Sequence, residues 1–191
     1  MVLMSLNEDQ RQQLFDLAEA SIKHGLRTGQ PLSVKLADYE GALTEDRATF
    51  VTLERHGQLR GCIGLLQAIR PLVEDVAENA FAAAFRDPRF PALRESEMSD
   101  LELHISILSP PETLTFSSEA DLLSQVRPGV DGLILQDHGH RGTFLPSVWK
   151  QLPDKVQFLQ QLKQKAGLPK NYWSETIEVA RYTTVMISHK P

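Results

Sequence analysis

Two apolar runs, residues 50–53 and 59–63, flank the dipeptide His56-Gly57, and this pattern constrains the fold more than any other in the chain. A two-residue loop with glycine in the second position is typical of a type I′ turn, which joins two antiparallel strands. We therefore predict a β-hairpin over residues 49–65.

The turn also predicts a register, in which the opposed pairs are Arg55 with Gln58, Leu53 with Arg60, and Val51 with Cys62. Side chains alternate along a strand, so Arg60 and Cys62 would share one face, with Cα atoms roughly 6.5 Å apart at about 3.3 Å per residue. Phe50, Leu59 and Ile63 would take the other face, which we predict to be core.

Cys62 is the only cysteine, so it can form neither an internal disulfide nor a CxxC metal site. A cationic neighbour such as Arg60 would favour the thiolate, which is the nucleophilic form. The alternative is that Cys62 is a small buried hydrophobe, as most free cysteines are. Gly61 and Gly64 weaken a strand unless something approaches the backbone or the chain bends. The hairpin thus supplies a candidate catalytic residue, Cys62, and three candidate substrate-binding residues, Arg60, Gly61 and Gly64.

A second candidate site lies in residues 87–91, which read DPRFP. Two prolines stiffen this segment, so Asp87 and Arg89 are presented in a fixed arrangement at the end of a predicted helix. Either residue could bind substrate, or the pair could be an ion pair that anchors the turn. Both interpretations stay open at the level of sequence.

Other chemical patterns are weaker. His138 and His140, with Asp137 adjacent, could bind a metal, but their spacing is short, no third ligand is assignable, and a polar hairpin tip also explains them. We assign no metal ligand and no cofactor from the sequence. The chain also lacks the glycine-rich nucleotide motifs, the esterase nucleophile elbow and the zinc-protease motif.

Residues 101–107 alternate between aliphatic and polar side chains, which predicts a half-buried strand. Glu102, His104 and Ser106 lie on its polar face. They do not fit a catalytic triad, because residues two apart on a strand point in parallel rather than at one another. A solvated strand face is the simpler interpretation.

Helices and further strands alternate along the remaining chain. The predicted helices run from a capping box at Ser5 and Glu8 to about Gly25, from Pro71 to Asp87, from Ser118 to Val126, and from Pro153 to Gly167. Further strands are predicted at 32–36, 132–136 and 176–187, the last with a bulge near 180–182. Few connections resemble βαβ units, so we predict an α+β fold with a mostly antiparallel sheet flanked by helices.

The composition is that of an ordinary globular chain, with 191 residues of which 41% are hydrophobic and 24% charged. No boundary separates two independent domains, so one domain over residues 1–191 is expected. The net charge of −5 makes nucleic acid an unlikely partner. The sequence shows no signal peptide and no membrane span, and with one cysteine it predicts a cytoplasmic protein.

Several segments together make the chain resemble the AMMECR family, also called AmmeMemoRadiSam system protein A. The matching segments are residues 50–53, 59–64, 87–90, 106–111, 129–133, 144–146 and 165–168, together with Trp173. They follow the family's order and cover nearly the whole chain. Two positions depart from its pattern: Lys163 stands where relatives often carry a second cysteine, and Asp131 where a histidine is common. These departures weaken a two-thiol mechanism and a catalytic histidine at that turn.

The resemblance implies an α+β fold with a larger antiparallel-sheet lobe, a smaller lobe and a cleft between them. It also implies a setting, because microbial relatives are often encoded beside, or fused to, a Memo-class protein and a radical S-adenosylmethionine (SAM) enzyme. These two proteins are the expected partners, in a modification pathway. The family brings no established activity with it.

Three functions follow. In the first, the chain is an enzyme or one subunit of the pathway, and its cleft uses Arg60 and Cys62. Arg60 would hold an anionic group of a small-molecule substrate, because its fork matches carboxylate or phosphate geometry. Asp87 and Arg89 would complete the wall of the cleft. In the second, the chain is a non-catalytic adaptor or substrate-binding protein, and Cys62 only packs.

The third function is an RNA-binding module. It is motivated by three arginines that lie close in sequence, Arg86, Arg89 and Arg94. The acidic net charge of the chain counts against this function.

Overall fold

The computed structural model describes residues 5–189 and divides the chain into two compact units. The first unit runs to Ser109 and takes up the chain again from Val185, and the second is Pro110–Thr184. The predicted α+β class is confirmed: each unit combines helices with a four-stranded sheet, and both sheets contain mostly antiparallel strand pairs. No helix within residues 5–189 is long and apolar enough to cross a membrane.

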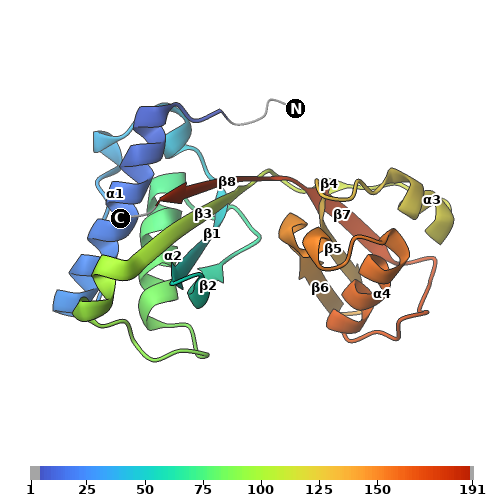
Figure 1. The fold of residues 1–191 in the computed structure, drawn as a ribbon. Coiled ribbons are helices and arrows are strands. Elements are labelled where there is room, and N and C mark those ends of the chain that lie inside the picture. The colour runs from blue at the N-terminus through green and yellow to red at the C-terminus, as the bar shows by residue number, and fades with distance from the viewer. Residues whose placement is uncertain (1–4, 190–191) are drawn as a thin grey trace. The chain divides into compact units, whose positions relative to one another are not determined.

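In the first unit, the sheet has the strand order β2-β1-β3-β8 and packs against two helices (Figure 1). Its elements are α1 (Glu8–Thr28), β1 (Ala48–Arg55), β2 (Gln58–Gly64), α2 (Leu72–Phe85), β3 (Leu101–Leu108) and β8 (Thr184–His189), with short 3-10 helices at Leu36–Asp38, Gly41–Thr44 and Glu95–Asp100. Val51, Leu53, Leu103 and Ile105 form one buried cluster with side chains of α1 and α2. Because side chains alternate, the residues between them lie on the opposite face of the sheet.

The helix α1 begins and ends later than predicted. Its capping box is formed by Asn7 and Gln10, not by Ser5 and Glu8, and its C-cap is Gly29 in the left-handed conformation. Gly25, the predicted terminus, lies inside the helix, where a Cβ atom would come within 2.5 Å of the ring of Phe85. This glycine therefore permits close packing of α1 on α2. Residues 32–36 form no strand.

The other predicted elements of the first unit are mostly confirmed. Pro71 stands at the N-cap of α2, and the helix ends at Phe85, before Asp87 and Pro88. An alanine-rich stretch of α2 is buried between α1 and the sheet, with members Ala77, Ala80, Ala83 and Ala84. The alternation predicted at 101–107 is present in β3.

The first hairpin has the predicted turn but not the predicted register. His56 and Gly57 both adopt positive φ, at 52° and 75°, and Arg55 lies opposite Gln58 as expected. The register then shifts between Leu53 and Glu54, because β2 contains one residue more than β1 over this stretch.

Arg60 is the extra residue. The true pairs are Glu54 with Leu59, Leu53 with Gly61, and Thr52 with Cys62, so the predicted pairs Leu53–Arg60 and Val51–Cys62 are wrong. Leu59 is 41% exposed rather than core, and Phe50 alternates with the buried Val51 and faces away from that cluster. Ile63 packs against the core as predicted.

The second unit has a sheet of strand order β4-β7-β5-β6 (Figure 1). Its elements are β4 (Glu112–Thr113), α3 (Glu119–Gln125), β5 (Gly132–Asp137), β6 (His140–Phe144), the 3-10 helix Pro146–Lys150, α4 (Lys155–Lys165) and β7 (Glu178–Tyr182). Ser118 caps α3 as predicted. In α4, Leu159 and Leu162 are buried as predicted, whereas Val156 is exposed.

The C-terminal tail forms two strands in different sheets. β7 belongs to the sheet of the second unit and β8 to that of the first. The change of alternation near residues 180–182 therefore marks the passage from one sheet to another, and the predicted bulge within a single strand is wrong.

The two residues that depart from the family pattern, Lys163 and Asp131, both form ion pairs. Lys163 is fully buried, and its Nζ donates to Glu119 Oε1 at 2.8 Å. Asp131 is also fully buried and accepts from Arg127 at 2.6 Å. Both side chains stabilise the second unit through ion pairs.

Candidate functional site

Cys62 lies on β2, an edge strand, directly opposite Thr52 of β1. The residue is partly exposed, and its Sγ is 3.1 Å from Thr52 Oγ1. Its backbone N–H donates to Asp87 Oδ2 at 3.0 Å, and its carbonyl oxygen accepts from Arg89 Nη2 at 3.5 Å. Edge strands expose unpaired backbone groups. Here the Asp87 and Arg89 side chains take the place of a neighbouring strand at Cys62.

Asp87 and Arg89 form a two-pronged ion pair just after α2. Arg89 Nη2 donates to Asp87 Oδ2 at 2.7 Å, and both Nε and the backbone N–H of Arg89 donate to Oδ1 at 3.0 Å. The hydrogen bonds from Arg89, with a further one from the Cys62 backbone, hold the pKa of the buried Asp87 carboxyl well below its usual range. The Arg89 side chain is 56% exposed, so its outer edge remains accessible to a ligand.

Arg60 is held in a separate ion-pair cluster. As the extra residue of β2, it directs its guanidinium at Glu97, with Nε–Oε1 at 2.9 Å and Nη2–Oε2 at 3.1 Å, and Nη2 also donates to the Pro91 carbonyl. The hydrogen bonds that Glu97 accepts from Arg60 lower its pKa to about 2. A hydrogen bond from the Arg94 backbone and the charge of Arg55 contribute in the same direction.

The remaining Arg60 nitrogen, Nη1, is buried and has no hydrogen-bond partner within residues 5–189. The structure therefore brings Cys62, Asp87 and Arg89 together, whereas the Arg60 fork pairs with Glu97. A role for Arg60 in binding substrate stays a prediction.

Gly61 and Gly64 are both required by backbone packing. A Cβ atom on Gly61 would lie 2.0 Å from the Ala83 carbonyl oxygen of α2, and one on Gly64 would lie 2.2 Å from the Thr49 carbonyl oxygen of β1. These contacts explain why glycine stands at both positions without any ligand. Their role as binding residues stays a prediction.

The sequence did not reveal that Cys62 shares a cross-strand row with a histidine. Thr52 pairs with Cys62 on one side and with His104 of β3 on the other. All three side chains lie on the sheet face opposite the helices. Alternation in residues 101–107 identified the face of His104, but nothing in the sequence identified β1 as its neighbour.

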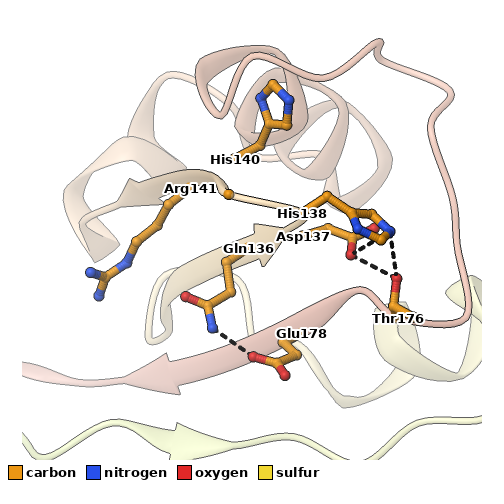
Figure 2. Close-up of a pocket in the computed structure, with 8 residues that line it drawn as sticks. Gln136, Asp137, His138, His140, Arg141, Thr176 and Glu178 are labelled. Carbon is orange, nitrogen blue, oxygen red and sulfur yellow. Dashed lines mark hydrogen bonds and ion pairs between the residues drawn. The ribbon is translucent and has the colours of Figure 1, made fainter.

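The His138–His140 pattern lies at the tip of the hairpin β5–β6, beside a pocket of about 460 Å³ (Figure 2). Asp137 accepts hydrogen bonds from Ser174, Tyr172 and Thr176, which lower its pKa to about 2.

The two histidine rings have different partners. His138 Nε2 is 3.1 Å from Thr176 Oγ1, whereas His140 Nδ1 is 3.2 Å from the Ala166 carbonyl oxygen. Figure 2 shows His138 directed toward Thr176 and His140 directed away from it. Within residues 5–189, these histidines do not join a third side chain in a metal-binding group.

Comparisons with known proteins agree with the resemblance seen in the sequence. A family model described as AMMECR1 matches residues 15–187. A protein from Methanothermobacter thermautotrophicus is 39% identical over 165 residues, covering 86% of this chain and 85% of the relative. One from Sulfolobus acidocaldarius is 35% identical over 191 residues, covering 95% and 82%. The crystal structure of the uncharacterized protein PH0010 from Pyrococcus horikoshii superposes with a TM-score of 0.86 at 33% identity, covering 96% of this chain and 93% of that one.

Proposed function

The chain belongs to the AMMECR1 family, and from this premise we propose that it is the thiol-bearing component of a modification pathway shared with a Memo-class protein and a radical SAM enzyme. The observation that carries the proposal is the way Cys62 is held. Side chains from a distant segment bind both its N–H and its carbonyl, while the residue stays partly exposed with its sulfur 3.1 Å from the Thr52 hydroxyl.

In this proposal each side chain has a separate task. Asp87 and Arg89 position the backbone of Cys62, so the thiol is presented in one orientation. The exposed edge of Arg89 binds an anionic group of the substrate, because a guanidinium fork matches carboxylate or phosphate. Cys62 then acts as nucleophile or thiol ligand. Arg60 maintains the bulge through Glu97.

The alternative proposal is an adaptor or substrate-binding protein without chemistry of its own. The extensive pairing between Asp87 and Arg89 favours it, because a rigid ion pair can serve recognition alone. The RNA-binding proposal gains no support, since Arg86 pairs with Glu78 and Arg89 with Asp87.

Replacement of the thiol separates these proposals. The chain would be combined with a Memo-class protein and a radical SAM enzyme, and the products followed by mass spectrometry. If Cys62 does chemistry, Cys62→Ser and Cys62→Ala abolish product formation while the circular dichroism spectrum and co-purification of the partners stay unchanged. Ser106→Ala, on the polar face of β3, is the matched control and leaves product formation intact. Unchanged product formation in both Cys62 variants would establish the adaptor instead.

A further inference from the structure

The pairing of β1 with β3 gathers three metal-ligating side chains on the sheet face opposite the helices. Glu54 lies directly across from Glu102, and His104 follows two residues along β3 on the same face. One ligand atom from each of the three lies within 4.8 Å of the others. We propose that Glu54, Glu102 and His104 bind a divalent transition-metal ion. This proposal does not depend on any chemistry at Cys62.

The distances suit a small ion. Zinc binds nitrogen and oxygen ligands at about 2.0–2.2 Å, so two ligands of a tetrahedral site lie about 3.3–3.6 Å apart. The separation between His104 Nε2 and Glu54 Oε2 is 3.3 Å. The Glu102 carboxylate lies within 4.8 Å of both atoms, which is close enough to supply the third ligand.

The orientation of the imidazole supports the same conclusion. His104 Nδ1 lies 2.7 Å from Ser188 Oγ on the neighbouring strand β8. With the Nδ1 proton donated to this hydroxyl, Nε2 directs its lone pair at the carboxylates. Metal-binding histidines are held in this way, by a second residue that binds the other ring nitrogen. In the other tautomer, the Ser188 hydroxyl donates to Nδ1 and Nε2–H donates to Glu54 Oε2 at 3.3 Å, and no cation is required.

Charge also favours a cation here. Like charges directly opposite one another in an antiparallel pair destabilise a sheet, and Glu54 and Glu102 are such a pair. A divalent ion offsets both charges at once. The competing explanation is an imidazolium form of His104, paired with Glu54 at 3.3 Å.

The ligand set indicates the kind of ion. One imidazole with two carboxylates suits zinc, manganese or ferrous iron better than magnesium or calcium, which prefer oxygen alone. Three protein ligands leave a position open for water or a substrate atom, as in catalytic zinc sites. Cys62 lies two strands away, about 10 Å at the usual strand spacing, and is not a ligand.

Cobalt substitution tests the site on the full chain. After treatment with a chelator, titration with Co²⁺ is expected to give one equivalent of bound ion with visible d–d absorption, and Zn²⁺ is expected to displace it. Glu54→Gln, Glu102→Gln and His104→Gln should each abolish the absorption. Ser188→Ala, which leaves all three ligands in place, should weaken binding about tenfold.

Two control variants locate the ion. His138→Gln, in the second unit, and Cys62→Ser should leave Co²⁺ binding unchanged, and circular dichroism verifies that every variant is folded. A folded wild-type chain that binds no Co²⁺ or Zn²⁺ would overturn the proposal and leave the imidazolium pair as the explanation. Binding that survives His104→Gln, or that is lost in Cys62→Ser or His138→Gln, would also overturn it.

Discussion

The hairpin β1–β2 of the first unit and the hairpin β5–β6 of the second are built on the same dipeptide turn. His56-Gly57 and His138-Gly139 both have two residues at positive φ, as a type I′ turn requires. In β5–β6 the register continues unbroken from Asp137–His140 to Leu133–Phe144. In β1–β2 it shifts within two residues of the turn, at Leu53 and Glu54.

This difference in register decides where the polar side chains of each hairpin lie and which residues they contact. The bulge removes Arg60 from the ladder, pairs it with Glu97, and sets Cys62 beside Thr52 at the edge of the sheet. The regular hairpin keeps its polar residues at the tip, where Asp137 meets hydroxyl groups from the segment around Thr176 (Figure 2). A shared turn therefore does not imply a shared site, because one inserted residue changes every later neighbour.

The largest expected effect comes from a glycine on the second strand of each hairpin. A Cβ atom on Gly61 would lie 2.0 Å from a backbone oxygen of α2, whereas one on Gly142 would lie 2.9 Å from the Ala166 nitrogen at the end of α4. We expect Gly61→Ala to lower the free energy of unfolding by about 3 kcal/mol and Gly142→Ala by about 1 kcal/mol. Urea unfolding followed by circular dichroism measures both.

Gly57→Ala is the control for that comparison, since nothing lies within 4 Å of its Cβ position and only its φ of +75° opposes a side chain. Gly57→Ala should lower the free energy of unfolding by about 1 kcal/mol. If Gly61→Ala and Gly57→Ala lowered the free energy of unfolding equally, packing of β2 on α2 would not be the reason for glycine at position 61.

An intermediate loss of stability is expected at low pH. Each hairpin is held by one carboxylate, that of Glu97 in the first unit and that of Asp137 in the second. The pKa of Glu97 and that of Asp137 are both lowered to about 2 in the folded chain, whereas unfolded carboxyls titrate near about 4. The folded state therefore binds fewer protons, so this stabilisation is present above about pH 4 and is lost as the pH falls toward about 2.

The variants Glu97→Gln and Asp137→Asn should each flatten the decline in unfolding free energy between pH 4 and pH 2. At pH 7, Glu97→Gln should also cost about 2 kcal/mol, because it removes charge-assisted hydrogen bonds to Arg60. Unfolding measured at a series of pH values tests this prediction. An unchanged acid slope in either variant would mean that its carboxylate is not held as the structure indicates.

The smallest effect concerns the turns themselves. Asparagine tolerates positive φ better than histidine and is favoured before glycine in type I′ turns. His56→Asn should therefore raise the free energy of unfolding by about 0.5 kcal/mol. His138→Asn should raise the free energy of unfolding by less, because this variant loses the contact between His138 and Thr176. Thermal unfolding of the two variants compares them, and a larger gain at position 138 would contradict the prediction.

The sequence alone determined the features that depend on neighbouring residues. The two His-Gly turns, the helix that follows Pro71, the cap at Ser118 and the alternation in 101–107 are all present in the structure. The α+β class was also readable, because conformational preference and periodicity act over a few residues. The family resemblance was readable from short matching segments such as residues 59–64 and 87–90. The fixed arrangement of Asp87 and Arg89 could likewise be predicted from neighbouring residues.

Only the tertiary structure decided the contacts between distant segments. It joined Cys62 to Asp87, turned Arg60 toward Glu97, placed Gly25 against Phe85, and divided the tail between two sheets. It also brought Glu54 beside His104, fifty residues along the chain. These contacts follow from strand register and from the packing of helices on sheets. Both minimise the free energy of the whole unit, so no local pattern encodes them.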